Sequence, residues 1–582
     1  MPTVRRPISN GPPFGGFLLL LALLASSVQL ACADAALQPP AQAVASAHPL
    51  ATEAGQAVLA AGGNAFDAAI AVSAALAVVE PYSSGMGGGG FWLLHRASDG
   101  RQVMVDGRER APLAAQRDLY QDEAGEVVPG LSMDGALAAA IPGQPAALAY
   151  LAEHYGRLPL ADSLAPAIRL AEQGFPVEEH YRRMATFRLP VLQEYIASAD
   201  TFLLDDQVPP AGHLVLQPDL AATLKALARH GRDGFYSGEV AARLVEGVRA
   251  AGGIWTAQDL ADYRVVEREP VSFEYRGFRI VSAAPPSSGG VALATMLHTL
   301  EGYRLGALDE ATRVHLVVEA MRRAYRDRAE YLGDPDYVEI PMQRLLSRYY
   351  TDGLRASIRL DRATPSAALP GAVGDTGGAD TTHFSVLDRE GNRVAATLSI
   401  NYPFGSGFVV PGTGVLLNDE MDDFSAKPGA PNAYGLVGAD ANAIAPGKRP
   451  LSSMSPTFVE SGKGVAILGT PGGSRIITMV LLGILDLEAG HGPASWVAQP
   501  RFHHQYLPDA IQYEPQALSD EVLAALRERG HGLQPLSRDY GNMQAIYWDY
   551  AGDRVEAASD PRGLGQASVV YVKERAVAAS GR

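Results

Sequence analysis

A change of composition late in the chain constrains its fold more than any other feature. Residues 361–380 (DRATPSAALPGAVGDTGGAD) are rich in alanine, proline, glycine and aspartate and have no hydrophobic periodicity. Such a segment is typical of a mobile loop. It runs directly into Thr381–Leu387 (TTHFSVL), which alternates like a β-strand, and a turn at 388–392 leads into a second strand at Arg393–Ile400. A pair of threonines therefore opens a strand immediately after a long irregular segment.

Composition excludes several classes of protein. The 582 residues are 47% hydrophobic and 19% charged, as in ordinary globular proteins. The net charge of −16 argues against a nucleic-acid-binding surface, which would be basic. Cys32 is the single cysteine of the sequence, so an intramolecular disulfide, a zinc–thiolate cluster and an iron–sulfur cluster are all excluded.

The first 33 residues have the pattern of an export signal. Arg5 and Arg6 give a positive start, Phe17–Leu24 (FLLLLALL) is strongly apolar, and Ala31–Ala33 is an A-x-A cleavage pattern. We expect cleavage after Ala33 and a periplasmic or secreted protein. An uncleaved N-terminal anchor is the alternative, although the apolar run is short for a membrane span. A twin-arginine route and lipidation at Cys32 are weaker readings.

The remaining pattern predicts alternating helical and strand regions. A helix is expected over 48–63, followed by an N-terminal cap at Asn64–Asp67 and a helix at Ala68–Val79 that is apolar on nearly every face. Residues 140–270 are predicted to be mostly helical, and 309–332 to form an amphipathic helix. Further strands are expected at Phe91–His95, Val103–Asp106 and Phe273–Ser282.

Several common catalytic motifs are missing from the sequence. There is no G-x-S-x-G, H-E-x-x-H or G-x-x-x-x-G-K-[ST]. Gly85–Gly90 matches the dinucleotide fingerprint G-x-G-x-x-G, but a helix precedes it and a strand follows, the reverse of the required order. His503 and His504 could ligate a metal, yet adjacent side chains on an extended segment point to opposite sides, which favours a structural role.

The threonine pair offers a different chemistry. If the bond between Asp380 and Thr381 were cut, the hydroxyl of Thr381 would lie beside its own α-amine. A free α-amine has a pKa of about 7.7–8.0 and can act as a base for that hydroxyl. The residues alone do not establish an N-terminal threonine nucleophile, since two β-branched residues also open many ordinary strands.

A set of segments identifies a family resemblance. They are Gly62–Phe91, Asp106–Pro112, Pro285–Gly290 (PPSSGG), Thr381–Asn401, Leu416–Tyr434, Arg449–Pro456 (RPLSSMSP), Gly469–Ile477 (GTPGGSRII), Pro500–Gln505 and Ala558–Arg562. In this order and spacing the chain resembles the γ-glutamyltransferases, members of the N-terminal-nucleophile hydrolase superfamily. The resemblance covers nearly all of the chain after the signal.

The resemblance implies an α+β fold and a maturation by autoproteolysis. The expected fold is a four-layer αββα sandwich whose sheets draw strands from both products. Thr381 would attack the carbonyl of Asp380, leaving a large subunit of residues 34–380 and a small catalytic subunit of residues 381–582. The two subunits would remain associated as a heterodimer because one core is built from both.

The resemblance also assigns residues to a pocket for a γ-glutamyl donor such as glutathione. Arg108, Ser452 and Ser453 would bind the α-carboxylate; Glu420 and Asp423 would face the α-ammonium, and Asn401 would contact the same end. The backbone N–H groups of Gly472 and Gly473 would bind the oxyanion, and Thr397 and Ser399 would lie beside the nucleophile. Tyr434, in the segment 427–439, would cover the pocket as part of a lid.

Two positions depart from the family pattern. Asp419 stands where asparagine is expected, and Ser399 where threonine is expected, which removes a methyl group next to the nucleophile. Their consequences, and the role of Asp422, are left open by the sequence. The implied reaction is acyl transfer through a γ-glutamyl-Thr381 ester, released by water or by an amino acid or dipeptide acceptor, with neither cofactor nor metal.

Two alternatives remain. A cephalosporin or glutaryl acylase of the same superfamily would share the nucleophile, but glutaryl groups lack the ammonium that Glu420 and Asp423 would face, and an unpaired buried acid is costly. An inactive, secreted binding protein would keep the pocket without cleavage.

Overall fold

The computed structural model describes residues 37–369, 381–427, 429–433 and 435–571. The predicted export signal, Asp380 at the expected cleavage point and Tyr434 of the expected lid all lie outside the described residues. No helix in the described ranges is both long and apolar enough to cross a membrane.

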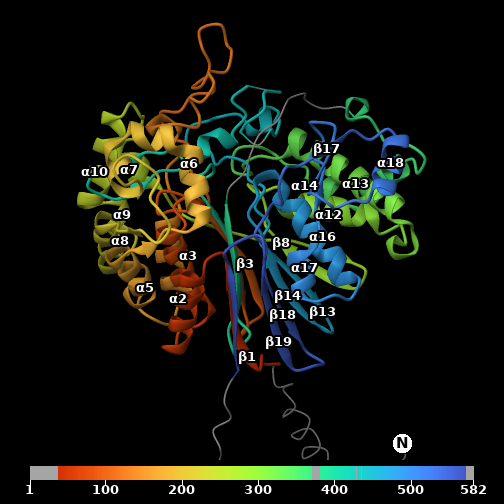
Figure 1. Cartoon of the computed structure of the whole chain (residues 1–582), viewed down its shortest axis with the longest axis horizontal. Coiled ribbons are helices and arrows are strands. Elements are labelled where there is room, and N and C mark those ends of the chain that lie inside the picture. The colour runs from red at the N-terminus through yellow and green to blue at the C-terminus, as the bar shows by residue number, and fades with distance from the viewer. Residues whose placement is uncertain (1–36, 370–380, 428, 434, 572–582) are drawn as a thin grey trace, which may run out of the picture. The chain divides into compact units, whose positions relative to one another are not determined.

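Two antiparallel sheets stack face to face in the region from Pro39 onward (Figure 1). The first sheet has the strand order β20 (Gln566–Tyr571), β1 (Ala41–Ser46), β9 (Thr382–Leu387), β10 (Arg393–Ser399), β2 (Gly89–Arg96), β3 (Arg101–Gly107) and β6 (Val266–Arg268). The second has the order β19 (Arg554–Ser559), β18 (Gln544–Asp549), β14 (Gly464–Gly469), β13 (Thr457–Ser461), β8 (Phe278–Ser282) and β7 (Val271–Tyr275).

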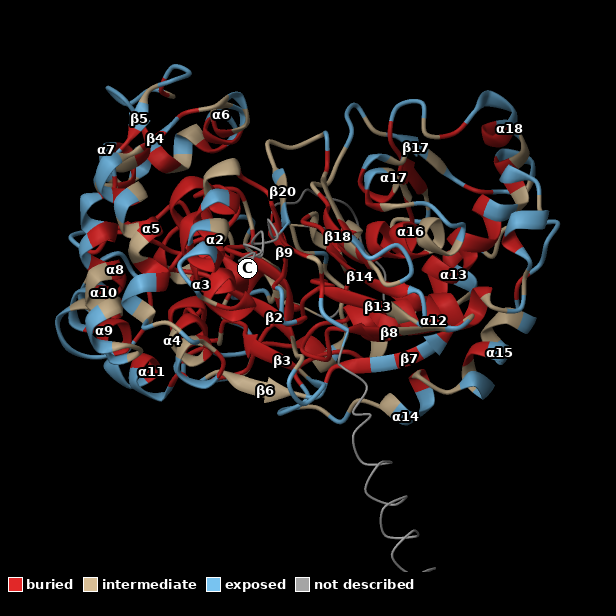
Figure 2. Ribbon diagram, turned by 90° about the horizontal axis from the view of Figure 1, so that it is seen from below, coloured by how far each residue is buried: buried red, intermediate tan, exposed pale blue. Residues whose placement is uncertain are grey.

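Apolar side chains of alternating strand residues fill the space between the sheets. In β1, Ala43 and Ala45 belong to the cluster between the sheets, whereas Val44 belongs to the cluster beneath the helices. Leu93 of β2 and Ile467 of β14 meet in the same inter-sheet cluster. Because both faces of each sheet are covered, central strands such as β1, β9, β10 and β14 are buried throughout, whereas the edge strands β6, β19 and β20 are mostly intermediate or exposed (Figure 2).

Helices cover the outer face of each sheet. The first sheet packs against α2 (Pro49–Ala60), α3 (Ala65–Val79) and α4 (Gln144–His154); the second packs against α12 (Gly289–Leu300), α16 (Ile476–Glu488) and α17 (Pro493–Ala498). Asn64 and Asp67 form the expected capping box at the start of α3, and every residue of α3 is buried. The predicted four-layer α+β sandwich is therefore confirmed.

The strand that follows the predicted cleavage point lies in the middle of the first sheet. β9 pairs with β1 on one side and with β10 on the other, and β10 in turn pairs with β2. The strands β1 and β2 precede residue 380 in sequence, while β9 and β10 follow it. One sheet is thus built from both sides of the predicted cut.

The glycine-rich loop before β2 packs directly against the site end of β10. A Cβ atom on Gly88 would lie 2.1 Å from the carbonyl oxygen of Ser399, and one on Gly87 would lie 2.0 Å from that of Leu416. Side chains cannot be accommodated at such distances, so these glycines permit a close backbone approach. This close backbone packing accounts for the run of glycines, so a dinucleotide-binding motif is not needed to explain it.

We expect Gly88→Ala to destabilise the fold by about 3 kcal/mol, because the added methyl must push the 399–400 backbone away. The free energy of unfolding from urea titrations measures this effect. Gly462→Ala is the matched control, since nothing lies within 4 Å of its Cβ position. Equal stability of the two variants would contradict the close-packing argument.

Candidate active site

Thr381 lies at the N-terminal end of β9, where the two sheets face each other. The side chains of His383 and Ser385 point toward the second sheet, with Ser385 Oγ 3.4 Å from the carbonyl oxygen of Ile467. Since side chains alternate along a strand, Thr381 has the same orientation. The register of β9 against β10 places Ser399 opposite Thr381. Thr381 is only 5% exposed.

A cavity with about 280 Å³ of empty space opens beside Thr381. Its lining comes from both sides of the predicted cut and includes most of the residues that the sequence singled out. The lining residues are Arg108, Thr381, Ser399, Asn401, Asp423, Leu436, Ser452, Ser453, Met454, Gly473, Ser474 and Ile476.

The two predicted oxyanion glycines follow β14 directly. Gly472 has φ +136° and Gly473 has φ +53°, conformations that residues with a side chain rarely adopt. A Cβ atom on Gly472 would also lie 2.6 Å from Cε of Met479. Within the described part of the chain, neither backbone N–H group donates a hydrogen bond. Two free donors therefore sit next to Thr381, ahead of α16.

Arg108 is fully buried at the end of β3 and is surrounded by carboxylates. Its guanidinium lies 2.6 Å from Glu420 and 3.4 Å from Glu109, forms a short ion pair with Asp423, and donates to the carbonyl oxygen of Pro450. Burial opposes the charge of Arg108, but the three carboxylates outweigh it and raise its pKa. The guanidinium is therefore a fixed positive charge.

Of the three acids around Arg108, Glu109 and Glu420 are fully buried and Asp423 is partly buried. The buried Arg328 adds a second positive charge near Asp423. Burial raises the pKa of Glu109 to about 7, despite the opposing effect of Arg108, and raises that of Glu420 well above its usual range. Neither oxygen of Glu420 accepts a well-aligned hydrogen bond within the described residues, nor does Oε1 of Glu109. The cluster is therefore suited to a molecule that carries an ammonium group beside a carboxylate.

The serine pair closes the same cavity from the segment before β13. Ser452 Oγ accepts a hydrogen bond from the backbone N–H of Met454, and the carbonyl oxygen of Ser452 accepts one from the backbone N–H of Ser288. The segment Pro285–Gly290 thus fixes the serine pair from behind. Ser453 Oγ is buried without a hydrogen-bond partner among the described residues. It remains available to a ligand in the cavity.

Asp419 acquires a role in the structure that the sequence left open. Its carboxylate accepts hydrogen bonds from the side-chain amide of Asn401 at 3.2 Å and from the backbone N–H of Tyr402 at 2.9 Å. Asn401 itself has φ +73°, a left-handed conformation that this pair of contacts stabilises. Burial raises the pKa of Asp419 well above its usual range. Asp419 positions Asn401 at the cavity wall.

Asp422 tethers the segment in which the lid was predicted. It accepts hydrogen bonds from Ser132 Oγ at 2.7 Å and from the backbone N–H of Ala433 at 2.8 Å. Burial raises the pKa of Asp422 to about 6. Leu436, from the same segment, lines the cavity.

Thr397 and Ser399 share a face of β10, as expected, but they differ in their contacts. Thr397 Oγ1 lies 2.8 Å from Nδ1 of His383, and Thr397 is not part of the cavity wall. Burial lowers the pKa of His383 to about 3, so its imidazole is neutral. Thr397 therefore contacts the nucleophile strand through His383, whereas Ser399 lies at the cavity.

Glu80 is a site residue that sequence reasoning missed. It lies at the C-terminal end of α3, lines a second cavity together with Thr381, and accepts a hydrogen bond of 2.8 Å from Thr382 Oγ1. Burial raises its pKa to about 7. The only signal in the sequence was an isolated acid between an apolar helix and Pro81, which does not by itself indicate a site.

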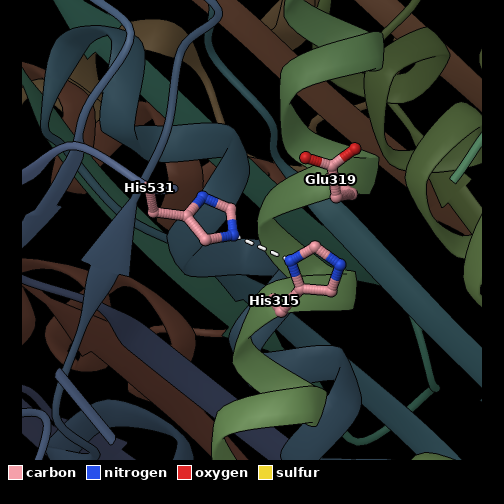
Figure 3. Close-up of side chains that lie close together, drawn as sticks. All are labelled: His315, Glu319 and His531. Carbon is pink, nitrogen blue, oxygen red and sulfur yellow. Dashed lines mark hydrogen bonds between the residues drawn. The ribbon is translucent and has the colours of Figure 1, made fainter. Parts of the chain in front are cut away.

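A cluster of His315, Glu319 and His531 has ligand atoms close enough together to hold a metal ion (Figure 3). Those atoms already have partners. His315 Nδ1 lies 2.8 Å from His531 Nε2, and Glu319 accepts hydrogen bonds from Arg323 and from both the N–H and hydroxyl of Thr364. Two arginines beside Glu319 also oppose a cation. We interpret the cluster as a structural hydrogen-bond network.

His503 and His504 have separate partners, as predicted from their adjacency. His503 Nδ1 contacts Thr478 Oγ1 at 2.9 Å, whereas His504 Nε2 contacts Asp509 at 3.3 Å. Burial lowers the pKa of both imidazoles.

Comparisons with known proteins agree with this geometry. The family model described as gamma-glutamyltranspeptidase matches residues 51–570. The glutathione hydrolase proenzyme of Pseudomonas sp. (strain A14) is 44% identical over 528 residues, which cover 88% of this chain and 92% of that protein. The chain belongs to the γ-glutamyltranspeptidase family.

Solved structures of the family and its relatives share the fold. The cephalosporin acylase of Bacillus halodurans superposes with a TM-score of 0.79 at 30% identity, covering 91% of this chain and 96% of that chain. A chain of the γ-glutamyltranspeptidase of Helicobacter pylori superposes with a TM-score of 0.54 at 40% identity, covering 56% of this chain and 93% of that chain.

The buried Glu80 should make the stability of the protein depend on pH. Its carboxyl ionises near 4.5 in an unfolded chain but near 7 in the fold, so its contribution to stability is lost as pH rises through this interval. We expect Glu80→Gln to match the wild type near pH 4. By about pH 8 the free energy of unfolding of the variant should exceed that of the wild type by up to roughly 3 kcal/mol. Urea unfolding across this range measures the difference; a difference independent of pH would contradict the assignment.

Proposed function

We propose that this chain is an exported γ-glutamyltransferase and glutathione hydrolase that cleaves its own backbone between Asp380 and Thr381. Residues 1–33 would be removed on export, and residues 34–380 and 381–582 would become the large and small subunits. The observation that carries the proposal is the surroundings of Thr381: Arg108, Asp423 and Gly473 line one cavity with it, and Gly472 lines the adjoining cavity with it.

In the maturation step, Thr381 Oγ attacks the carbonyl carbon of Asp380 and the resulting ester is hydrolysed. The cut frees the α-amine of Thr381, which then serves as base for its own hydroxyl. The position of β9 between β1 and β10 supports this step, because the subunits stay joined through the sheet after the bond is broken.

The charged cluster is suited to the amino-acid end of a γ-glutamyl donor. Arg108 would bind the α-carboxylate in the two-pronged manner that a guanidinium allows, together with Ser452 and Ser453. The α-ammonium would then meet Glu420 and Asp423, and its positive charge would favour the ionised form of Glu420, whose pKa burial raises. Asn401 would contact the same end of the donor, and Tyr434 would cover it.

In the transfer step, Thr381 Oγ attacks the γ-amide carbon, the amine leaves with a proton, and a γ-glutamyl ester remains. Donors aimed at the oxyanion, such as the N–H groups of Gly472 and Gly473, typically contribute about 2.7–4 kcal/mol each to the transition state. Ser399 lies beside the hydroxyl, while Thr397 acts as a positioning residue through His383. Water or the amine of an amino acid or dipeptide then cleaves the ester.

A cephalosporin acylase is the second candidate, because the acylase of Bacillus halodurans superposes over nearly the whole chain. The acidic side chains around Arg108 favour a γ-glutamyl substrate over a glutaryl one. A glutaryl side chain carries no ammonium, so Arg108 would remain the cation that pairs with Glu420 and Glu109 while it also binds the ligand carboxylate.

Replacing the nucleophile separates the proposal from an inactive binding protein. We expect Thr381→Ala to give one uncut chain on a denaturing gel without γ-glutamyl hydrolysis, because neither cleavage nor acyl transfer is possible. Thr381→Ser is the control; it keeps the hydroxyl and should be cut and active. A Thr381→Ala protein that is cut normally and releases glutamate would refute the proposal.

Matched anilides separate the two enzyme candidates. We expect the wild type to hydrolyse a γ-glutamyl anilide with a kcat/KM on the order of a hundredfold higher than that of the glutaryl anilide, since the glutaryl group brings no ammonium to the buried acids. Asp423→Asn should lower the ratio of kcat/KM for the γ-glutamyl anilide to kcat/KM for the glutaryl anilide. Equal rates on the two anilides would favour the acylase.

A further inference from the structure

A second cavity, lined by positive charge, also borders Thr381. Counted together with the open solvent at its mouth, its empty space is about 1920 Å³, against about 280 Å³ for the cavity at Arg108. Thr381 lines both, Gly473 lines the smaller one and Gly472 the larger one. The predicted nucleophile and oxyanion donors therefore lie at the junction of two cavities.

Three arginines of the larger cavity lack a carboxylate partner. In the described part of the chain, Arg183, Arg475 and Arg538 form no ion pair. Arg183 Nη2 contacts the imidazole of His180 at 2.8 Å, and burial lowers the pKa of that imidazole to about 4, so it is neutral. Arg475 donates to Gln512 Oε1 at 2.8 Å.

The other charged groups of the wall do not cancel this charge. Arg562 is neutralised by Glu514 at 2.8 Å and Asp560 at 3.1 Å. Asp539 is an exposed carboxylate in the same wall, and Glu80 is protonated for part of the time because burial raises its pKa to about 7. The cavity keeps a surplus of positive charge in a chain whose net charge is −16.

The position of this charge determines which part of a substrate meets it. If the amino-acid end of a γ-glutamyl donor occupies the cavity at Arg108, its amide carbon reaches Thr381 at the junction. Whatever is attached to the amide nitrogen must then extend into the larger cavity. An acceptor amine must approach the ester from the same side.

We propose that the larger cavity is a subsite for a carboxylate on the amine side of the γ-glutamyl bond. Arg183, Arg475 and Arg538 would bind the carboxylate of a peptide or amino acid that leaves as the amine or enters as the acceptor. This inference rests on the proposed function, since it needs a γ-glutamyl ester at Thr381. Guanidinium groups bind carboxylates strongly and with defined geometry.

The test compares leaving groups that differ in one carboxylate. The substrates are γ-glutamyl para-nitroanilide and its ring-carboxylated analogue, and also glutathione and its C-terminal amide. We expect the wild type to favour the carboxylated member of each pair. In the double variant Arg183→Gln/Arg538→Gln, the ratio of kcat/KM between carboxylated and neutral members should fall about tenfold, mainly through KM.

Three further measurements separate a local contact from a general loss of charge. Arg249 is an exposed arginine of α10 (Gly238–Ala250) that forms no ion pair with any described residue, so Arg249→Gln should leave the ratio unchanged. The charge reversal Arg538→Glu should lower the ratio further and favour a leaving group that carries an ammonium. High salt should reduce the wild-type ratio toward that of the double variant.

The possible outcomes distinguish this inference from the proposed function. A wild type that hydrolyses none of the γ-glutamyl substrates would refute the proposed function. A wild type that hydrolyses them, with the same ratio in the double variant and the charge-reversal variant, would refute the carboxylate subsite alone. An equal loss of activity on charged and neutral leaving groups would also refute it.

Discussion

The pairing of β9 with β1 and β10 is the constraint on which the rest of the site depends. It holds the residues after position 380 in the centre of a sheet whose other strands come largely from before it. The alternation of β9 then directs Thr381 into the space between the sheets, toward the loop that carries Gly472 and Gly473. A break in the backbone before Thr381 would release no part of the core, because both pieces contribute strands to each of the two large sheets.

The two cavities that meet at Thr381 have opposite electrostatic character. On one side, Arg108 is paired with three acids, of which burial raises the pKa of two, and this cluster suits a zwitterionic amino-acid group. On the other side, a wider space is lined by arginines that pair with no carboxylate among the described residues. A substrate with an ammonium and a carboxylate at one end and a further carboxylate at the other would match both. The arrangement orients such a molecule with its central amide at the nucleophile.

Local patterns in the sequence predicted the elements that carry their own signals. The capping residues Asn64 and Asp67, the apolar helix after them and the hairpin of β9 and β10 follow from short-range chemistry. Helix 310–331 was also predicted, but it is buried on more faces than an amphipathic pattern implies, because α12 packs against it on one side and α18 (Asp520–Glu528) on another. The roles of the site residues came from family resemblance rather than from spacing.

What the sequence could not supply are contacts between distant segments. Glu80 meets Thr382 across 302 positions, and Arg183 and Arg538 share a cavity wall although they lie on opposite sides of the predicted cut. Asp419 departs from the asparagine expected at its position, and its contacts with Asn401 and Tyr402 in the structure explain the carboxylate there. Such residues have no local pattern, because only the tertiary fold brings their partners to them.

The most direct test of the central claim is N-terminal sequencing of the purified, active protein. The account predicts two chains, one of which begins with Thr381-Thr382-His383. The other chain should begin near residue 34. An active preparation that contains a single chain with the bond between 380 and 381 intact would contradict the account.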